Sequence, residues 1–368
     1  MKKKILALVL CLVLTAGLAV GCNGKGSEEV KDTGEKTTDA ALDDSNDQDA
    51  ADATASGEWD PSDESNITLA GDVETKYGPL PEDAVTEGMT FGAVFPEASN
   101  EYWKTVAKGI EDFCSERGIK TDIQFALTTE DQSGQLAAAE TLEKKDLDAY
   151  IFAPMTADLF TNLTNQLKEN KKPVINAYFT PMENADVFVG AMDSQIAELA
   201  AQYTIDVLDG KGKVAMAMAA VSSRTNQIRC GLYKEYIEAN SEIEVVAEMP
   251  AEWVPETAMQ MTEDLLTTIP DVDLIWCAND NLALGVMEGL RSRDALGKTK
   301  VLSMDATTSA INAVAEGELF GTYSTDPYFT GRMCAEICLR KIAGQEIDRV
   351  IACPVELVDA SNVDKYLK

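Results

Sequence analysis

The segment Leu274-Ile275-Trp276-Cys277-Ala278-Asn279-Asp280 shows the pattern from which the fold class follows. It begins with an apolar run, ends in two polar residues and leads into an amphipathic segment at residues 282–291. A short apolar run that ends this way is typical of a buried strand in a parallel sheet, and the amphipathic segment is typical of the helix that covers it. The stretch therefore predicts an α/β protein.

The same pattern repeats from residue 89 onward. The expected strands of a first half are residues 90–95, 120–126, 149–152, 174–177 and 187–190. Those of a second half are residues 213–218, 244–249, 274–277, 300–304 and 320–324, and a last strand is expected near residues 350–357. This alternation predicts two doubly wound, Rossmann-like lobes with parallel sheets, joined by a multi-strand hinge.

The chain should pass between the lobes several times. We assign residues 89–192 and 326–352 to the N-terminal lobe, and residues 193–325 and 353–368 to the C-terminal lobe. The crossings are expected near residues 191–193, 325–327 and 353. Open parallel sheets bind ligands at the carboxyl ends of their strands, so we expect a cleft between the lobes at those ends.

The N-terminal region is of a different kind. Three lysines precede an apolar run at residues 5–18, and Gly21-Cys22 follows. This resembles the signal peptide and lipobox of bacterial lipoproteins, which predicts a signal peptide at residues 1–22 and a lipid anchor on Cys22; plain secretion or an uncleaved anchor are the alternatives. The acidic, weakly apolar residues 23–88 are expected to form a disordered tether. Together these features predict a protein held on the outer face of the cell membrane.

The composition excludes several functions. The 368 residues hold 31 Lys and Arg against 63 Asp and Glu, so the formal net charge is -32 and opposes nucleic-acid binding. There is no histidine, which excludes Ser-His-Asp and Cys-His catalysis and any His-ligated metal site. We expect no cofactor and no metal. Six cysteines beyond residue 89 show no CxxC spacing and are expected to be buried thiols; they are Cys114, Cys230, Cys277, Cys334, Cys338 and Cys353.

Aromatic and polar side chains follow the expected strands where the strands end. They are Asn100, Tyr102, Trp103, Trp253, Asn279 and Asp305. Aromatic rings can pack on the C–H face of a sugar, while amides and carboxylates pair with its hydroxyls. The alternatives are that Trp103 only anchors its helix in the core and that Asp280 or Asp305 only caps a helix.

With these motifs the sequence resembles the ribose-type periplasmic binding proteins, the sugar-binding subunits of bacterial ABC importers. Tyr102-Trp103, Ala278-Asn279-Asp280 with Ala283-Leu284-Gly285, and Ser303-Met304-Asp305-Ala306 carry the resemblance, which covers about residues 89–368. It implies that the six strand-end residues named above contact a sugar.

The sequence departs from that family at two places. Tyr178 and Phe179 follow the fourth strand where the family has Asp-Arg, and Asn226 aligns with a family arginine that Arg224 or Arg229 could replace. The expected ligand-binding set therefore includes Tyr178, Phe179, Asn226 and Arg229. Fewer guanidinium donors favour a less polar or differently shaped saccharide or polyol.

The resemblance implies a monomer that binds a sugar or polyol, closes its lobes around it and delivers it to an ABC permease, without enzymatic activity. One alternative is a sensor that presents a sugar, nucleoside or autoinducer-like molecule to a membrane receptor or kinase. Another is a secreted glycosidase that uses Asp280 and Asp305. A nucleoside or amino acid as the ligand is a further alternative.

Overall fold

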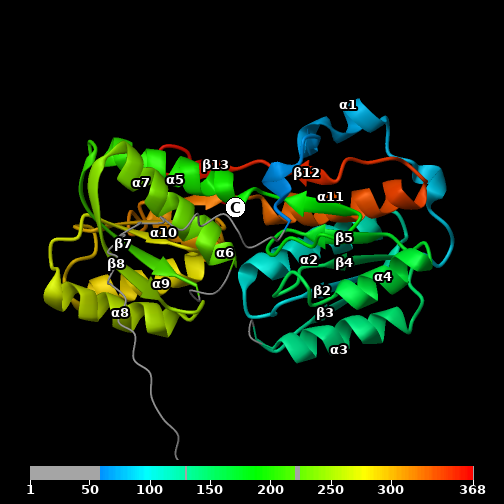
Figure 1. Cartoon of the computed structure of the whole chain (residues 1–368), viewed down its shortest axis with the longest axis horizontal. Helices are drawn as coiled ribbons and strands as arrows, with labels where there is room; N and C mark the ends of the chain where they lie inside the picture. Colours follow the sequence, from blue (N-terminus) through cyan, green and yellow to red (C-terminus); the bar gives the residue numbers. More distant parts are fainter. Residues whose placement is uncertain (1–58, 129–130, 220–223, 368) are drawn as a thin grey trace, which may run out of the picture. The chain divides into compact units, whose positions relative to one another are not determined.

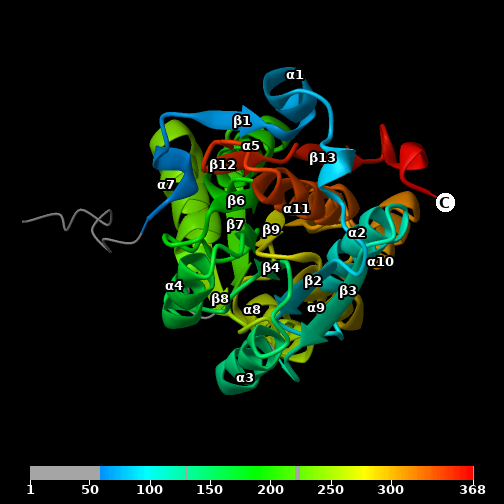
Figure 2. The ribbon, with the colours of Figure 1, turned by 90° about the vertical axis from the view of Figure 1, so that its right-hand side faces the viewer.

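The computed structural model describes residues 59–128, 131–219 and 224–367, which all belong to one compact unit, Ser56–Lys368. Their strands form two separate sheets, each covered by helices (Figure 1, Figure 2). We call each sheet with its helices a lobe. The first lobe contains the strand that begins at Thr90, and the second contains the strand that begins at Lys211.

The sheet of the first lobe has the strand order β1-β12-β6-β5-β4-β2-β3, and all its neighbouring strands are parallel. In chain order the strands are β1 (Ile67–Leu69), β2 (Thr90–Phe95), β3 (Lys120–Phe125), β4 (Ala149–Phe152), β5 (Val174–Ala177), β6 (Val187–Gly190) and β12 (Val350–Ala352). Its helices are α1 (Val73–Tyr77), α2 (Glu101–Ser115), α3 (Gln132–Glu143), α4 (Thr161–Glu169) and α11 (Pro327–Ile342).

The central strands β2, β4, β5 and β6 of this sheet are buried on both faces, which explains their nearly continuous apolar runs. Ala93 and Phe95 of β2 belong to the same apolar cluster as Ile110 of α2, whereas Val94 between them belongs to a second cluster with Leu142 of α3. Successive strand residues point to opposite faces, so a strand covered on both faces needs apolar residues at nearly every position.

The sheet of the second lobe has the order β13-β11-β10-β9-β7-β8. Its strands are β7 (Lys211–Met218), β8 (Glu242–Pro250), β9 (Leu274–Cys277), β10 (Lys300–Met304), β11 (Gly321–Ser324) and β13 (Glu356–Asp359). Its helices are α5 (Asp193–Val207), α6 (Arg224–Asn226), a π-helical segment (Gln227–Leu232), α7 (Tyr233–Asn240), α8 (Pro255–Thr268), α9 (Asp280–Ser292) and α10 (Thr308–Ala315). Only β13 pairs antiparallel to its neighbour; the other pairs are parallel.

The described chain passes from one sheet to the other after β6, after β11 and after β12. The prediction of two doubly wound α/β lobes with a multi-strand hinge is therefore confirmed. One strand was predicted wrongly. The expected last strand near residues 350–357 is two strands, β12 in the first sheet and β13 in the second. Pro354 separates them, since proline cannot donate to a strand ladder.

The expected tether extends too far along the chain. Residues 59–88 are folded onto the first lobe: β1 pairs with β12 as an edge strand, and α1 follows it. Thr68 of β1 donates a hydrogen bond of 2.7 Å to Asp348, and the Tyr77 hydroxyl lies 3.0 Å from the Thr68 hydroxyl. These contacts compensate for the low apolar content on which the tether prediction rested.

Residues 1–58, with the expected signal peptide, Cys22 and the rest of the expected tether, lie outside the described residues. In the described ranges we find no helix with both the length and the apolar character needed to cross a membrane. The lobe boundaries stay a prediction, although every described strand except β1 lies within the boundaries given for its lobe.

Candidate ligand-binding site

A pocket lies where loops of both lobes meet at the carboxyl ends of the strands. It encloses about 430 Å³ that protein atoms do not fill, part of it open to solvent. From the first lobe it is lined by Glu97, Asn100, Tyr102, Trp103, Tyr178 and Phe179, and from the second by Arg229, Trp253, Asn279, Asn281 and Asp305. Every residue predicted to bind a ligand lines this pocket, except Asn226.

Aromatic rings from both lobes form one wall of the pocket. The Phe179 ring lies between Trp103, at a centroid distance of 5.7 Å, and Trp253, at 6.2 Å. Trp103 is also anchored in the core of its own lobe, because it stacks on Phe95 at 5.5 Å with an interplanar angle of 21°. Trp103 therefore fills both roles weighed from the sequence: it packs in the core and it lines the pocket.

Three of the pocket loops have unusual backbone angles. Tyr178 and Phe179 have φ values of 32° and 67°, Glu252 and Trp253 have 52° and 64°, and Asp305 has 118°. Side chains larger than glycine adopt such angles at a cost, and they cluster at sites where the surroundings hold them in place. These turns aim the Tyr178, Phe179, Trp253 and Asp305 side chains away from the strand direction and toward the pocket.

A close backbone approach fixes the position of Tyr178. A Cβ atom at Gly190 of β6 would lie 2.7 Å from the Tyr178 Cβ, so only glycine leaves room for this side chain. The Tyr178 hydroxyl donates to Asp193 at the start of α5, and Arg229 Nη2 donates to the same hydroxyl at 3.0 Å. Tyr178 thus connects the two lobes beside the pocket.

Arg229 lies on the π-helical segment, a wider turn that often marks functional sites. It is 3 % exposed, and its Nε donates to Asp193 at 2.8 Å while Nη1 donates to the Ala278 carbonyl at 3.0 Å. A guanidinium has five N–H donors, and three are used by the described residues. The others are available to a ligand.

The two asparagines use one end of their amides for the fold. Asn100 Oδ1 accepts from the backbone N–H of Tyr102 and caps α2, and Asn279 Oδ1 accepts from Leu282 and caps α9. Neither Nδ2 group has a hydrogen-bond acceptor within the described ranges. Each cap therefore presents an amide donor to the pocket.

Asp305 supplies the buried acceptor. It is 6 % exposed, and its carboxylate accepts no hydrogen bond from the residues that the structure describes. Burial raises the pKa of the Asp305 carboxyl well above its usual range, and the nearby carboxyl of Asp280 raises it further, while Arg229 opposes the shift. Thr307, and not Asp305, caps α10, so the cap alternative for Asp305 is wrong.

Asp280 is part of the fold and does not line the pocket. It is fully buried, and its two oxygens accept hydrogen bonds from the hydroxyls of Ser303, Thr322 and Thr307 and from the Thr307 backbone N–H. Burial raises its pKa to about 6 against the opposing effect of these donors. The pair of carboxylates that a glycosidase would need from Asp280 and Asp305 is therefore not present in the pocket.

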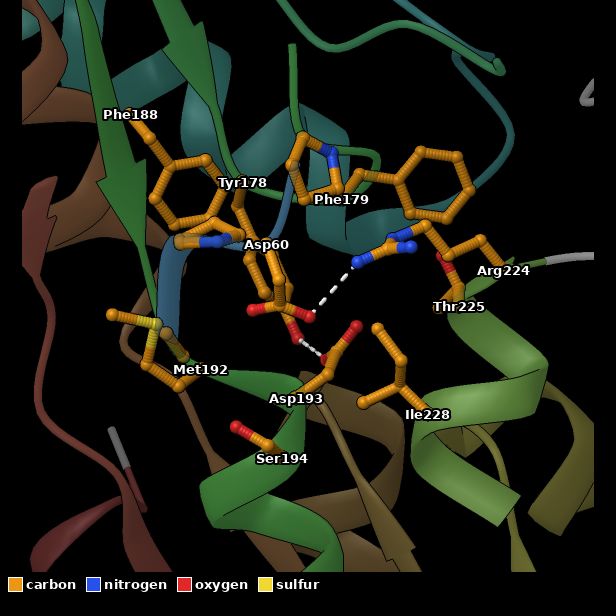
Figure 3. Close-up of a pocket in the computed structure, with 13 residues that line it drawn as sticks. Asp60, Tyr178, Phe179, Phe188, Met192, Asp193, Ser194, Arg224, Thr225 and Ile228 are labelled. Carbon is orange, nitrogen blue, oxygen red and sulfur yellow. Dashed lines mark hydrogen bonds and ion pairs between the residues drawn. The ribbon is translucent and has the colours of Figure 1, made fainter. Parts of the chain in front are cut away.

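The structure separates the residues considered for the family arginine. Asn226 is 2 % exposed, and its Oδ1 accepts a hydrogen bond from the Ala219 backbone at 3.1 Å, so it holds the turn after β7 and is not brought to the pocket. Arg229 lines the pocket in its place. Arg224 lines a neighbouring hollow, shown in Figure 3.

Glu97 and Asn281 line the pocket but were missed. Both are adjacent to predicted features, since Glu97 lies in the loop after β2 and Asn281 follows Asn279-Asp280. Their position after a strand end was the available signal.

All six predicted thiols are free and buried. Burial raises the pKa of the Cys114, Cys230 and Cys353 thiols to about 12, which makes them poor nucleophiles. The described residues contain no group of three or more Cys, Asp or Glu that could hold a metal ion.

Comparisons with known proteins agree with this geometry. A family model described as "Periplasmic binding protein domain" matches residues 91–346. The D-allose-binding periplasmic protein of Escherichia coli K12 is 26 % identical over 64 % of this chain and 79 % of its own length.

Two solved structures show the same fold. An ABC transporter periplasmic solute binding protein of Actinobacillus succinogenes, with bound D-allose, has a TM-score of 0.72, is 24 % identical and covers 76 % of this chain and 100 % of its own. A solute binding protein of Bacillus halodurans, with bound myo-inositol, has a TM-score of 0.70, is 22 % identical and covers 76 % and 98 %. These matches confirm the resemblance found in the sequence.

Proposed function

Because this chain belongs to the periplasmic binding protein family, we propose that it captures a sugar or polyol in the pocket between its lobes and delivers it to an ABC permease. The observation that carries the proposal is the composition of the pocket. Aromatic faces from both lobes lie beside the Asp305 carboxylate, which accepts no hydrogen bond from the described residues, and beside N–H groups of Arg229 that those residues leave unused.

Each part of the pocket matches a part of such a ligand. The rings of Trp103, Phe179 and Trp253 offer apolar faces for the C–H surface of a ring-shaped polyhydroxy compound. The free N–H groups of Arg229 and the asparagine amides donate to hydroxyl oxygens, and Asp305 accepts from hydroxyl protons. The similar solved structures contain D-allose and myo-inositol, which both carry hydroxyls around a ring.

Capture takes place by closure of the lobes. A ligand that touches Trp103 of the first lobe and Trp253 of the second stabilises the closed arrangement through contacts that an open cleft cannot make. The rotation is taken up at the three chain crossings. Stacking supplies affinity, and the buried polar groups supply selectivity, since leaving one of them unpaired costs about 1–3 kcal/mol.

The family consists of solute-binding proteins, and we propose that this chain also acts by binding and not by catalysis. The Lys-rich start, the apolar run and Gly21-Cys22 support a lipoprotein held by Cys22 on the outer face of the membrane. We propose that it works there as a monomer.

A ligand screen tests the function. The full-length protein is heated with D-allose, D-ribose, D-xylose, myo-inositol, adenosine or L-leucine, each in large excess, because a ligand that binds only the native state raises the melting temperature. We expect at least one of the sugars or myo-inositol to raise it, and calorimetry then gives Kd. A rise with adenosine or L-leucine alone would contradict the proposal.

Two further readouts separate the alternatives. Unchanged sugar after long incubation with the protein, followed by NMR, is expected of a binding protein, whereas new anomeric signals would indicate a glycosidase. Cross-linking in native membranes is expected to join the protein to a permease. A kinase or receptor as the cross-linked partner would instead support the sensor.

A further inference from the structure

Residues 59–64, which we call the latch, precede β1 and are fixed on the first lobe. The Trp59 ring packs edge-on against Phe188 of β6 at 6.4 Å, and the Arg349 guanidinium lies 4.1 Å above it. Glu64 accepts hydrogen bonds from Trp59 Nε1 at 2.7 Å and from Arg349 at 3.0 Å. The latch therefore moves with the first lobe.

One side chain of the latch reaches the other lobe. Asp60 Oδ2 accepts a hydrogen bond of 2.9 Å from Nη2 of Arg224, which belongs to α6 of the second lobe (Figure 3). The second oxygen, Oδ1, accepts from the Ser62 backbone N–H at 2.8 Å, which orients the carboxylate. The Asp60 and Arg224 side chains are 21 % and 16 % exposed, so the ion pair is partly shielded from solvent.

The pair lies next to the proposed ligand site. Asp60 and Arg224 line a hollow whose other walls include Tyr178, Phe179 and Asp193 (Figure 3). Tyr178 and Phe179 also line the ligand pocket, so the two hollows meet at these residues. The ion pair thus joins the lobes in a hollow that shares Tyr178 and Phe179 with the ligand pocket.

We propose that the Asp60–Arg224 ion pair is a further non-covalent connection between the lobes, which forms on closure and raises the affinity for the ligand. The inference rests on closure as part of the proposed function. The two residues are positioning residues, because neither lines the ligand pocket. A contact made only in the closed state raises the closed population, and the ligand affinity rises by the same factor when the open state dominates.

The test measures closure without any ligand. Ser309 Oγ of the second lobe lies 3.3 Å from Glu101 Oε1 of the first, so cysteines placed there by Glu101→Cys and Ser309→Cys meet only when the lobes are closed. Their rate of disulfide formation under a mild oxidant reports the closed population. Peptide mass spectrometry identifies the cross-link, and the native described cysteines are buried.

In that background we expect Asp60→Asn and Arg224→Gln each to slow cross-linking about twofold to fivefold, the range of a partly exposed ion pair. The double variant should be no slower than the slower single variant, because both substitutions remove the Asp60–Arg224 contact. Asp60→Asn keeps an oxygen that accepts from Ser62, so the turn of the latch should be preserved. High salt should slow cross-linking in the protein that keeps Asp60 and Arg224, but not in the variants that lack the ion pair.

The matched control is Lys213→Gln, which removes an ion pair with Asp271 inside the second lobe and should leave the rate unchanged. Cross-linking at the unsubstituted rate in both Asp60→Asn and Arg224→Gln would contradict the proposal that this ion pair favours the closed state. So would a double variant that shows the product of two independent losses. Because no ligand is present, failure of the latch is distinguishable from failure of the sugar-binding proposal.

Discussion

The residues that line the pocket are held in arrangements that cost folding free energy. Trp253 has a positive φ, and Asp305 is a buried acid that accepts no hydrogen bond within the described residues. Such costs persist only where the surrounding structure compensates for them, and they are typical of sites arranged for a ligand. We therefore expect single substitutions of pocket residues to weaken ligand binding without lowering the stability of the fold.

Trp253→Ala should weaken binding of the sugar or polyol found in the screen by about tenfold to a hundredfold. The ring would no longer bury its apolar face against the ligand, and burial of such a side chain contributes about 1.5–3 kcal/mol. Trp253 is only partly buried without ligand, so the melting temperature should change little. Calorimetric titration gives Kd.

The control for Trp253→Ala is Tyr236→Ala, which removes a partly exposed ring on α7 outside the pocket. It should leave Kd unchanged. Equal affinity of the unsubstituted protein and Trp253→Ala would mean that the ligand binds elsewhere.

Asp305→Asn should stabilise the protein at pH 7 by a few degrees and weaken ligand binding about tenfold. Burial raises the pKa of Asp305 in the folded state, so the folded protein binds this proton more tightly than the unfolded chain does. The resulting stability is present below the unfolded pKa and is lost as the pH rises through the folded pKa. An asparagine amide does not ionise, so it loses no stability as the pH rises. Its oxygen accepts a hydrogen bond from a ligand hydroxyl more weakly than a carboxylate does.

Melting curves from pH 4 to pH 8 check this sign. The advantage of Asp305→Asn should be largest at pH 8 and shrink toward pH 4, where the folded carboxyl is protonated and the unfolded one is about half protonated. An advantage that grows as the pH falls would show that the charged carboxylate is stabilised in the fold.

These residues could be predicted from the sequence, because polar and aromatic residues that follow a predicted strand can be recognised there. Asp305 directly follows β10, and Trp253 lies in the loop after β8, so their place at the cleft needed only the strand assignment. Asn226 was assigned to the site because it aligns with an arginine of the family. The structure instead uses Asn226 to hold the Ala219 backbone and brings Arg229, on the π-helical segment that follows, to the pocket.

At the scale of elements, α2 and α11 pack against each other unusually closely. A Cβ at Gly109 of α2 would lie 2.1 Å from the Tyr328 carbonyl oxygen, and one at Gly331 of α11 would lie 2.0 Å from the Val106 carbonyl oxygen. The two glycines let the helices meet backbone to backbone. This contact fixes α2, whose first turn carries Tyr102 and Trp103.

Gly109→Ala should lower the melting temperature by about 2–10 °C, because the methyl group meets a backbone oxygen that cannot move without shifting α11. Gly71→Ala is the matched control, since a Cβ there meets nothing within 4 Å. Calorimetry of both variants checks the prediction. A Gly109→Ala protein that melts like Gly71→Ala would show that the helices separate at little cost.

The buried strands and covering helices were predictable from their period, and β2, β4, β5 and β9 lie where the sequence placed them. β1 was not. Its inward residue is Thr68, which is 3 % exposed, while Ile67 and Leu69 point outward. The hydrophobic alternation is therefore inverted, and the strand is held by hydrogen bonds that only the folded chain brings together.

For the whole molecule, residues 59–88 have two roles. They contain the latch, which contacts the second lobe, and β1, which covers the edge of the first lobe's sheet. β1 covers the edge of β12, and Lys76 and Thr68 both bond to Asp348. Edge strands left uncovered invite pairing with other chains. The stability of the first lobe should therefore depend on residues 59–88, although their composition resembles that of a disordered tether.

A chain that starts at Met89 should melt about 5 °C or more below a chain that starts at Ser56, and it should aggregate more readily. It loses the buried side chains of Ala70 and Val73 and exposes the β12 edge. Burial of a valine side chain alone contributes about 1.5–3 kcal/mol. Calorimetry and light scattering of the two chains check both expectations. Because Asp60 is lost with this segment, the shorter chain should also bind its ligand more weakly than the longer chain does. Equal melting temperatures and equal affinities of the two chains would show that residues 59–88 act only as a tether.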